Sequence, residues 1–247
     1  MFFKNCPFRI RYFLNHLLCS ITIGCCTALV VYKIWYPGLL AKAIGVSHIF
    51  LLLLTIDVIV GPILTLFLAK EGKKGVWFDL TVVIIIQLTA LIYGVWHIAE
   101  GRPIWQVINI YRVELITGSD DMNYQNASVD YASASLLGPR WAMVRPYKDE
   151  KEKSEWLWKE LEEGKSPARQ AEMYQSIEGH WQDIAKEILP LNDLNKFNDT
   201  ESVGNVLKKF PDADGFLPMI GKDWDMTVLV SNKSQKILGI VDLRPWK

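Results

Sequence analysis

Three long apolar runs in the first hundred residues set the strongest limit on how this chain folds. They cover residues 14–36, 48–68 and 77–98, and each is longer than 20 residues. A helix rises about 1.5 Å per residue, so each run reaches across the roughly 30 Å hydrocarbon core of a bilayer. The sequence therefore predicts a membrane protein with three transmembrane α-helices in the lipid bilayer.

The charge balance changes sign along the chain, which predicts a domain boundary near residue 103. Residues 1–103 hold nine Lys or Arg against four Asp or Glu, and residues 104–247 hold 18 against 23. The second part alternates polar and apolar residues, as a folded domain in water does. We therefore expect a membrane domain over 1–103 and a soluble domain over 104–247. The acidic second part has no cluster of Lys and Arg for phosphates, so we expect no nucleic-acid partner.

Basic residues beside the apolar runs predict the orientation in the membrane. The segments before the first run and between the second and third carry Lys4, Arg9, Arg11, Lys70, Lys73 and Lys74. The segment between the first and second runs carries Lys42 alone. Short segments rich in Lys and Arg stay in the cytoplasm. We therefore expect a bacterial inner-membrane protein with a cytoplasmic N-terminus and a periplasmic C-terminal domain.

An alternative for the first run is a lipoprotein signal cleaved before Cys25. Asn15 and His16 interrupt its apolar region, which then continues to Tyr36, and both features favour a transmembrane span. All four cysteines lie within the first 26 residues. The soluble domain must therefore be stable without a disulfide.

An acidic residue, Asp57, lies near the middle of the second apolar run. An ionised carboxylate there is costly unless it is neutralised, hydrated or paired. Gly61 and Thr65 follow at four-residue steps, so all three share one small, polar helical face suited to close helix contact. Pro62 removes a backbone hydrogen bond to Val58 and predicts a kink beside this face.

Similar faces occur on the other two runs, and we expect the three faces to meet. The third run carries Gln87, Ala90, Gly94 and His97, and the first carries Asn15, Cys19, Thr22 and Cys26. In one interpretation Asp57, Gln87 and Thr89 form an internal hydrogen-bonded cluster with Asp57 protonated. In the other they serve a partner helix or a proton or ion path. The candidate partner-binding residues are Asp57, Gly61, Pro62, Thr65, Gln87 and Gly94.

The sequence contains no motif typical of catalysis or of a bound cofactor. His48, His97 and Glu100 lie near the outer ends of the runs, but they are too scattered to predict a metal site. No nucleophile elbow accompanies His180, which is the only histidine of the second part. We therefore expect a protein that is not an enzyme and uses no cofactor or metal. A membrane enzyme built on His48, His97 and Glu100 stays a weaker alternative.

Patterns within 104–247 predict an α+β domain with an antiparallel sheet. β-branched residues favour a strand over Val107–Ile116, and Trp141–Val144 favours a second. A hairpin is expected from 226–231 and 236–242. Helices are expected over 150–163, at the spacing of Trp181, Ile184 and Ile188, and over 202–210.

Three stretches resemble the type IV pilin accessory proteins, an inner-membrane family usually encoded beside the major pilin. They are DVIVGPILT at 57–65, FDLTVVIIIQLTALIYG at 78–94 with GRP at 101–103, and FLPMIGKDWDMTVLV at 216–230. The similarity reaches nearly the whole chain except about 120–205. It implies a non-enzymatic helper, with pilin as its partner, that acts on the stability, assembly or surface display of that pilin.

The resemblance suggests that Asp57, Gly61 and Thr65 face the pilin helix or support the surface that does. Another function stays open, in which a small component of a transport or proton-coupled complex uses Asp57 as a carrier site. Three helices are few for a transport pathway, so such a component would need to self-associate.

Overall fold

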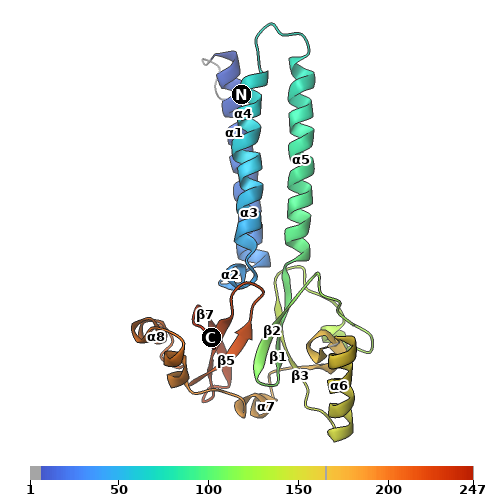
Figure 1. Cartoon of the computed structure of the whole chain (residues 1–247), viewed down its shortest axis with the longest axis vertical. Helices are drawn as coiled ribbons and strands as arrows, with labels where there is room; N and C mark the ends of the chain where they lie inside the picture. Colours follow the sequence, from blue (N-terminus) through green and yellow to red (C-terminus); the bar gives the residue numbers. More distant parts are fainter. Residues whose placement is uncertain (1–6, 165, 247) are drawn as a thin grey trace. The chain divides into compact units, whose positions relative to one another are not determined.

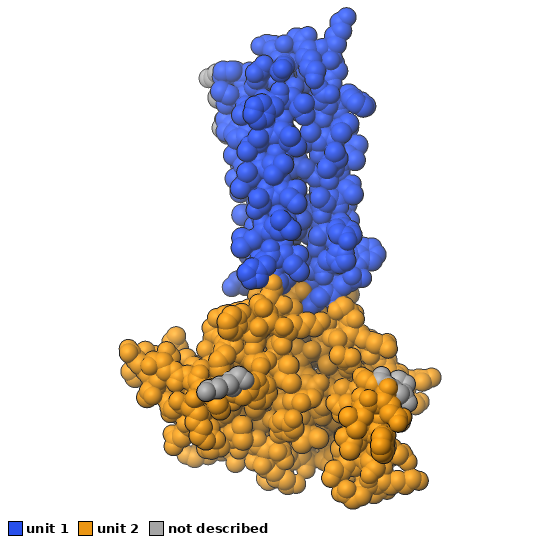
Figure 2. All heavy atoms as spheres, viewed as in Figure 1, with its two compact units in different colours: residues 1–34, 46–101 blue, residues 35–45, 102–247 orange. Residues whose placement is uncertain are grey.

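The computed structural model describes residues 7–164 and 166–246, and Figure 1 shows long helices and a region built around a sheet. The chain forms two compact units, coloured separately in Figure 2. The first contains residues up to Ile34 and Val46–Gly101, and the second contains Trp35–Gly45 and Arg102–Lys247. The sequence-based boundary near residue 103 placed Trp35–Gly45 with the membrane part, whereas the structure folds this segment with the sheet.

Within the described residues, three helices are long and apolar enough to cross a membrane, at Phe8–Trp35, Val46–Leu68 and Val76–Glu100. The first is α1 (Phe8–Leu29), continued by the π-helical segment η1 (Val30–Trp35), and the third is α5 (Val76–Glu100). The predicted fold class, three apolar helices followed by an α+β domain, is confirmed.

The second long helix changes geometry at its centre. It consists of α3 (Val46–Leu54), the π-helical segment η2 (Thr55–Val60) and α4 (Gly61–Leu68). The backbone N–H of Gly61 donates to the carbonyl of Ile56, five residues back. Pro62 follows directly and has no N–H to donate. The irregularity that Pro62 predicts therefore takes the form of a π-helical segment, a feature often found at functional sites.

Among the described residues of the second unit, seven strands form one mixed sheet, in the order β4, β3, β1, β2, β5, β6, β7. The strands are β1 (Pro103–Asn109), β2 (Arg112–Thr117), β3 (Arg140–Val144), β4 (Tyr174–Gln175), β5 (Gly215–Ile220), β6 (Met226–Ser231) and β7 (Lys236–Val241). The β1–β3 and β2–β5 pairs are parallel, and the other neighbours are antiparallel. An antiparallel arrangement therefore describes the hairpins but not the whole sheet.

The predicted strand Val107–Ile116 is in fact the β1–β2 hairpin, which turns at Ile110 and Tyr111. Ile110 has a φ of 56°, a left-handed conformation that is rare and costly for a β-branched residue. Neither of the two turn residues is Gly or Asn, although Asn109 directly precedes them. The continuous β-branched pattern therefore hid it.

A second strand missing from the sequence-based prediction is β5, which contains Pro218. A proline lowers the expectation of an inner strand because it cannot donate to the ladder. In β5 the register with β2 involves Met219 and Ile220, after the proline. The strand therefore lies inside the sheet despite Pro218.

The helices of the second unit follow their capping residues. In α6 (Glu150–Glu163), Asp149 accepts a hydrogen bond from the Glu152 N–H, and Gly164 ends the helix in a left-handed conformation. The predicted helix at Trp181 is short, and Ile188 lies beyond its end. The remaining helices are α2 (Leu40–Ile44), α7 (Trp181–Ala185) and α8 (Thr200–Leu207), with 3₁₀ turns η3 (Val129–Tyr131), η4 (Pro167–Arg169), η5 (Ala171–Met173) and η6 (Leu191–Lys196).

The two faces of the sheet have different coverings. Alternate strand residues point to opposite faces, and one face packs with α2 and α7 around Leu217, Met219 and Val228. The opposite face carries two clusters. Trp105 lies in the one under α6, η4 and η5, and Phe216 lies in the one under α8 and η6.

The short helix α2, between the first and second long helices, belongs to this core. Leu40 is 1% exposed and packs in the same cluster as Leu217. The Ala43 carbonyl accepts hydrogen bonds from the backbone N–H of Asp223 at 2.9 Å and of Trp224 at 3.3 Å. A Cβ at Gly221 would lie 2.6 Å from the Ala43 carbonyl oxygen, so only glycine permits this approach.

Candidate functional site

The polar face predicted on the second long helix lies inside the first unit. Asp57 is 8% exposed and Thr65 is 3% exposed, and Gly61 and Pro62 between them are buried. The second long helix packs against both α1 and α5, so this face meets its two neighbours. These residues therefore lie between the helices and not on their outer surface.

Gln87 of α5 joins this face through close contact. Its Nε2 donates to the backbone carbonyl of Asp57 at 3.2 Å. The same amide lies where a side chain of residue 61 would begin, with a Cβ built there only 1.7 Å from Nε2. Gly61 therefore gives Gln87 access to the backbone of η2. Thr89, proposed for the same cluster, is exposed and donates to the carbonyl of Ile85 in its own helix.

His16 of α1 completes a polar cluster with Asp57, Thr65 and Gln87. Its place in this cluster was not predicted from the sequence. His16 Nδ1 lies 2.6 Å from Thr65 Oγ1. The His16 ring also lies close enough to interact with the Gln87 side chain. Helical periodicity places a residue on a face but does not say which faces of three helices meet. A weak signal was present, because His16 is a polar residue inside an apolar run.

The other predicted faces are only partly correct. A Cβ at Gly94 of α5 would lie 2.7 Å from Leu53 Cδ1, so this glycine does allow close packing on the second long helix. His97, on the same predicted face, is exposed. Thr22 and Cys26 of α1 are also exposed, whereas the buried residues of α1 are Ser20 and Gly24. The buried face of α1 is therefore rotated by part of a helical turn from the predicted one.

A cavity of about 380 Å³ lies between α1 and α5 beside the polar cluster. Its polar lining includes Asn15, His16, Ser20, Asp57, Thr65 and Gln87. A second hollow of about 630 Å³ continues between the same helices, lined by Thr27 of α1 and by α5 residues from Leu91 to Glu100. We call the two hollows together the α1–α5 groove. It is the candidate functional site of the first unit.

The histidines considered as metal ligands do not gather. Among the residues that the structure describes, no group of three or more His, Cys, Asp or Glu side chains is placed to hold a metal ion. His97 pairs with Glu100 at 3.7 Å, and His48 lies exposed on α3. In the second unit, His180 Nδ1 lies 3.0 Å from the carbonyl oxygen of Ser176, a local contact before α7.

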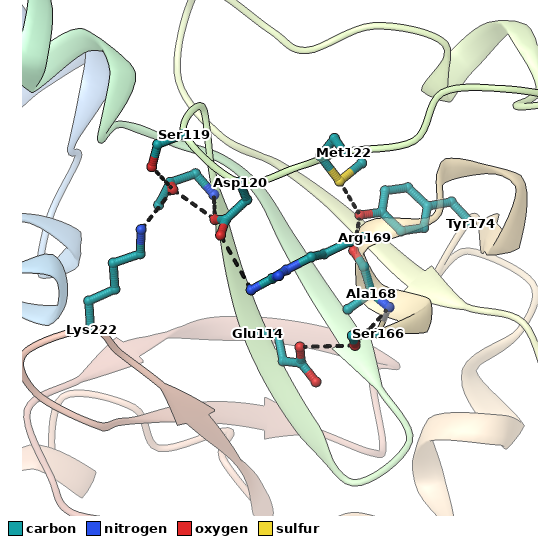
Figure 3. Close-up of polar contacts among 10 residues, drawn as sticks. Glu114, Ser119, Asp120, Met122, Ser166, Ala168, Arg169, Tyr174 and Lys222 are labelled. Carbon is teal, nitrogen blue, oxygen red and sulfur yellow. Dashed lines mark hydrogen bonds and ion pairs between the residues drawn. The ribbon is translucent and has the colours of Figure 1, made fainter. Parts of the chain in front are cut away.

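A polar network in the second unit lies at the end of β2 (Figure 3). Asp120 Oδ2 accepts hydrogen bonds from the backbone N–H and hydroxyl of Thr117, both at 2.7 Å, and Arg169 pairs with its Oδ1 at 3.4 Å. Lys222 donates to the Thr117 hydroxyl at 2.9 Å. Nearby, Ser166 lies 3.5 Å from a Glu114 oxygen. The network joins three segments that are far apart in the sequence, around residues 117–120, 169 and 222.

Comparisons with known proteins identify the family of this chain. The sequence profile of a family described as fimbrial assembly protein FimB matches residues 4–38. A fimbrial assembly protein of serogroup I from Dichelobacter nodosus is 28% identical over 237 residues, covering 92% of this chain and 88% of that protein. Another, of serogroups C1 and C2, is 34% identical over 107 residues, covering 42% of this chain and 82% of that protein. No solved structure matches. The chain therefore belongs to the FimB family of fimbrial assembly proteins, in line with its resemblance to type IV pilin accessory proteins.

Proposed function

We propose that this protein is a non-enzymatic accessory factor of type IV pilus biogenesis, acting on the stability, assembly or surface display of its cognate pilin. The observation that carries the proposal is the similarity, over 92% of the chain, to a protein named for fimbrial assembly. The stretches that resemble type IV pilin accessory proteins support it, because they occur in both units.

The protein acts in the bacterial inner membrane, with the N-terminus in the cytoplasm and the second unit in the periplasm. The lysines of the segment between α4 and α5 support this orientation. Chain connectivity is compatible with it. Trp35–Gly45 and Arg102–Lys247 fold together, so the chain segments after the first and third long helices share one compartment.

Pilin is the proposed partner in this function. A pilin subunit awaiting assembly has one apolar helix in the membrane and a globular head outside it, and this chain offers a surface for each. The predicted partner-binding residues of the second long helix are buried, namely Asp57, Gly61, Pro62 and Thr65. They therefore support the docking surface from beneath, and most of its contacts are made by the more exposed residues around them.

Transport is the second candidate function, and Asp57 is the observation that favours it. One of its carboxylate oxygens, Oδ1, is buried without a hydrogen-bond partner among the described residues, and the side chain lines the groove. A carrier site for a proton or ion would use such a group. A flux that depends on pH or on membrane potential, lost in Asp57→Asn, would favour transport.

The proposal is tested by deleting the gene and complementing it with the wild type, Asp57→Ala, Asp57→Asn or Thr89→Ala. Pilin level, surface pili and crosslinking to pilin are measured at matched protein abundance. We expect deletion to reduce surface pili and Thr89→Ala to restore them fully, because Thr89 is exposed and bonds within its own helix. Unchanged pilin and pili after deletion would refute the accessory role. Normal values for both Asp57 variants would leave Asp57 with a purely internal role.

A further inference from the structure

Asp57 brings an unsatisfied polar atom to the α1–α5 groove. The residue is 92% buried, and its Oδ1 has no hydrogen-bond partner among the described residues. Gln87 is 91% buried, and its Oε1 also lacks a hydrogen bond, although His16 lies near the amide. A buried polar atom without a partner is costly, most of all in apolar surroundings. The groove therefore suits an occupant that carries a hydrogen-bonding group.

The length of the groove matches a helix that spans the bilayer. Its α5 wall extends from Trp77 to Glu100, and a helix rises about 35 Å over that distance. This is close to the thickness of the hydrocarbon core. Apart from the polar cluster, much of the lining is apolar, including Ile23, Leu80, Ile84, Leu88, Leu91 and Val95. An apolar helix with one polar residue fits both parts of the lining.

A second copy of this chain is a poor occupant. Several threonine hydroxyls on its long helices donate to a carbonyl four residues back in the same helix, those of Thr22, Thr27, Thr55 and Thr89. Cys19, Cys25 and Cys26 are exposed, but thiols are weak donors. Thr81 and Tyr93 are also exposed on α5, but each lies six residues, about 9 Å along the helix, from Gln87. The described outer faces of the first unit therefore offer no strong free donor at the level of Asp57. A different protein is the better match.

We propose that the α1–α5 groove binds the apolar transmembrane helix of the pilin partner and receives one hydroxyl, amide or carboxyl side chain of that helix at Asp57. This inference rests on the proposed function and assigns its contact surface. Gly61 and Gln87 act as positioning residues, because their contact holds the floor of the groove beside Asp57.

Site-specific photocrosslinking in membranes that contain the full-length protein and pilin tests the inference. A benzophenone amino acid replaces Ile84 or Val95, which line the groove, or Ile86 or Tyr93, which are 62% and 67% exposed and do not line it. All four positions are on α5, so depth and expression are closely matched. We expect pilin adducts at Ile84 and Val95 and only background adducts at Ile86 and Tyr93.

Substitution of Asp57 separates hydrogen bonding from packing. Asp57→Asn keeps a hydrogen-bonding group and should retain the Ile84 adduct. Asp57→Leu should lower it by about three- to tenfold, the range for losing one hydrogen bond between membrane helices. If Asp57→Leu is poorly folded, Gln87→Leu in full-length protein of normal abundance gives a second readout and should also weaken the adduct.

The outcomes distinguish this inference from the proposed function. Equal pilin adducts at Ile84 and Ile86, or adducts at Ile84 only with lipid or with a second copy, would overturn the groove as the pilin site. Retention of the full adduct in both Asp57→Leu and Gln87→Leu would overturn the role of the polar cluster. In each case a loss of pili on gene deletion would leave the accessory function standing, whereas an unchanged deletion strain would refute that function itself.

Discussion

The side-chain amide of Gln87 occupies the space that a side chain on Gly61 would fill, and from there it bonds to the backbone of η2. The Gln87 amide can occupy this position only because residue 61 has no Cβ. This contact joins α5 to the second long helix beside Asp57. Substitutions at Gly61 and Gln87 therefore test how much this contact contributes to the stability of the first unit.

Gly61→Ala should displace the Gln87 amide and break its hydrogen bond to the Asp57 carbonyl. We expect a loss of about 1–2 kcal/mol in the free energy of unfolding of the full-length protein in detergent. In a Gln87→Ala background the same substitution should cost much less, because the obstructing side chain is gone. Thermal unfolding of the two single variants and the double variant measures the coupling. If the losses of stability in the two single variants add up in the double variant, a clash with Gln87 is not the reason why residue 61 must be glycine.

Gly221→Ala should disrupt the docking of α2 onto the second unit. Its Cβ would lie 2.1 Å from the Trp224 carbonyl oxygen and 2.6 Å from that of Ala43, and backbone atoms cannot move aside as a side chain can. We expect a loss of about 3 kcal/mol or more in the stability of this unit. Hydrogen exchange of β5 and β6 measures the effect. Gly204→Ala is the control, because a Cβ on this residue of helix α8 would have no atom of another residue within 4 Å outside the neighbouring helix backbone. Equal exchange in both variants would contradict the prediction.

Trp156 and Trp158 of α6 should respond very differently to truncation. Trp156 is 6% exposed and packs in the cluster under α6, whereas Trp158 is 61% exposed. We expect Trp156→Ala to destabilise the second unit by about 3–5 kcal/mol and Trp158→Ala by about 0.5 kcal/mol or less. Protease resistance of α6 and of the neighbouring strand β3 gives the comparison. A large loss in Trp158→Ala would reveal packing of that ring that the structure does not contain.

Glu152 should make the stability of the second unit depend on pH in the acid range. Bidentate hydrogen bonds from Arg145, with a further one from the Lys148 N–H, lower the pKa of Glu152 to about 2. The unfolded value is about 4.3, so the contribution is complete above that pH and is lost as the pH falls toward 2.

Glu152→Gln should therefore reduce stability by about 1 kcal/mol near neutral pH, and its difference from wild type should shrink as the pH is lowered from 5 to 3. Unfolding monitored by hydrogen exchange of α6 at several pH values measures this. The control is Glu155→Gln, whose pairing with Lys151 is exposed and 3.9 Å long. A difference between Glu152→Gln and wild type that stays constant down to pH 3 would contradict the assignment.

Much of the architecture could be predicted from the sequence because local patterns report local structure. The three apolar helices follow from run length and composition alone. Helix α6 covers the predicted residues 150–163. The β6–β7 hairpin also lies where the alternation predicted it. In each case the pattern and the structure involve the same few neighbouring residues.

The features that prediction missed depend on contacts between distant residues. Ile110 takes its left-handed turn because the strands on both sides are held in a buried sheet, and Pro218 lies in β5 for a similar reason. Helix α2 belongs to the second unit only because Leu40 finds a core formed by residues far along the chain.

The sequence by itself therefore determined the three apolar helices, the acid at their centre and the α+β character of the remainder. Run length, charge and periodicity are properties of a single segment, so they predict its structure without knowledge of the segments that pack against it. Only the tertiary structure decided that Gly61 faces Gln87, that His16 meets Thr65, and that a groove lies between α1 and α5. The rotation of each helix about its axis is set by close packing against its neighbours, and that packing exists only once all three helices are assembled.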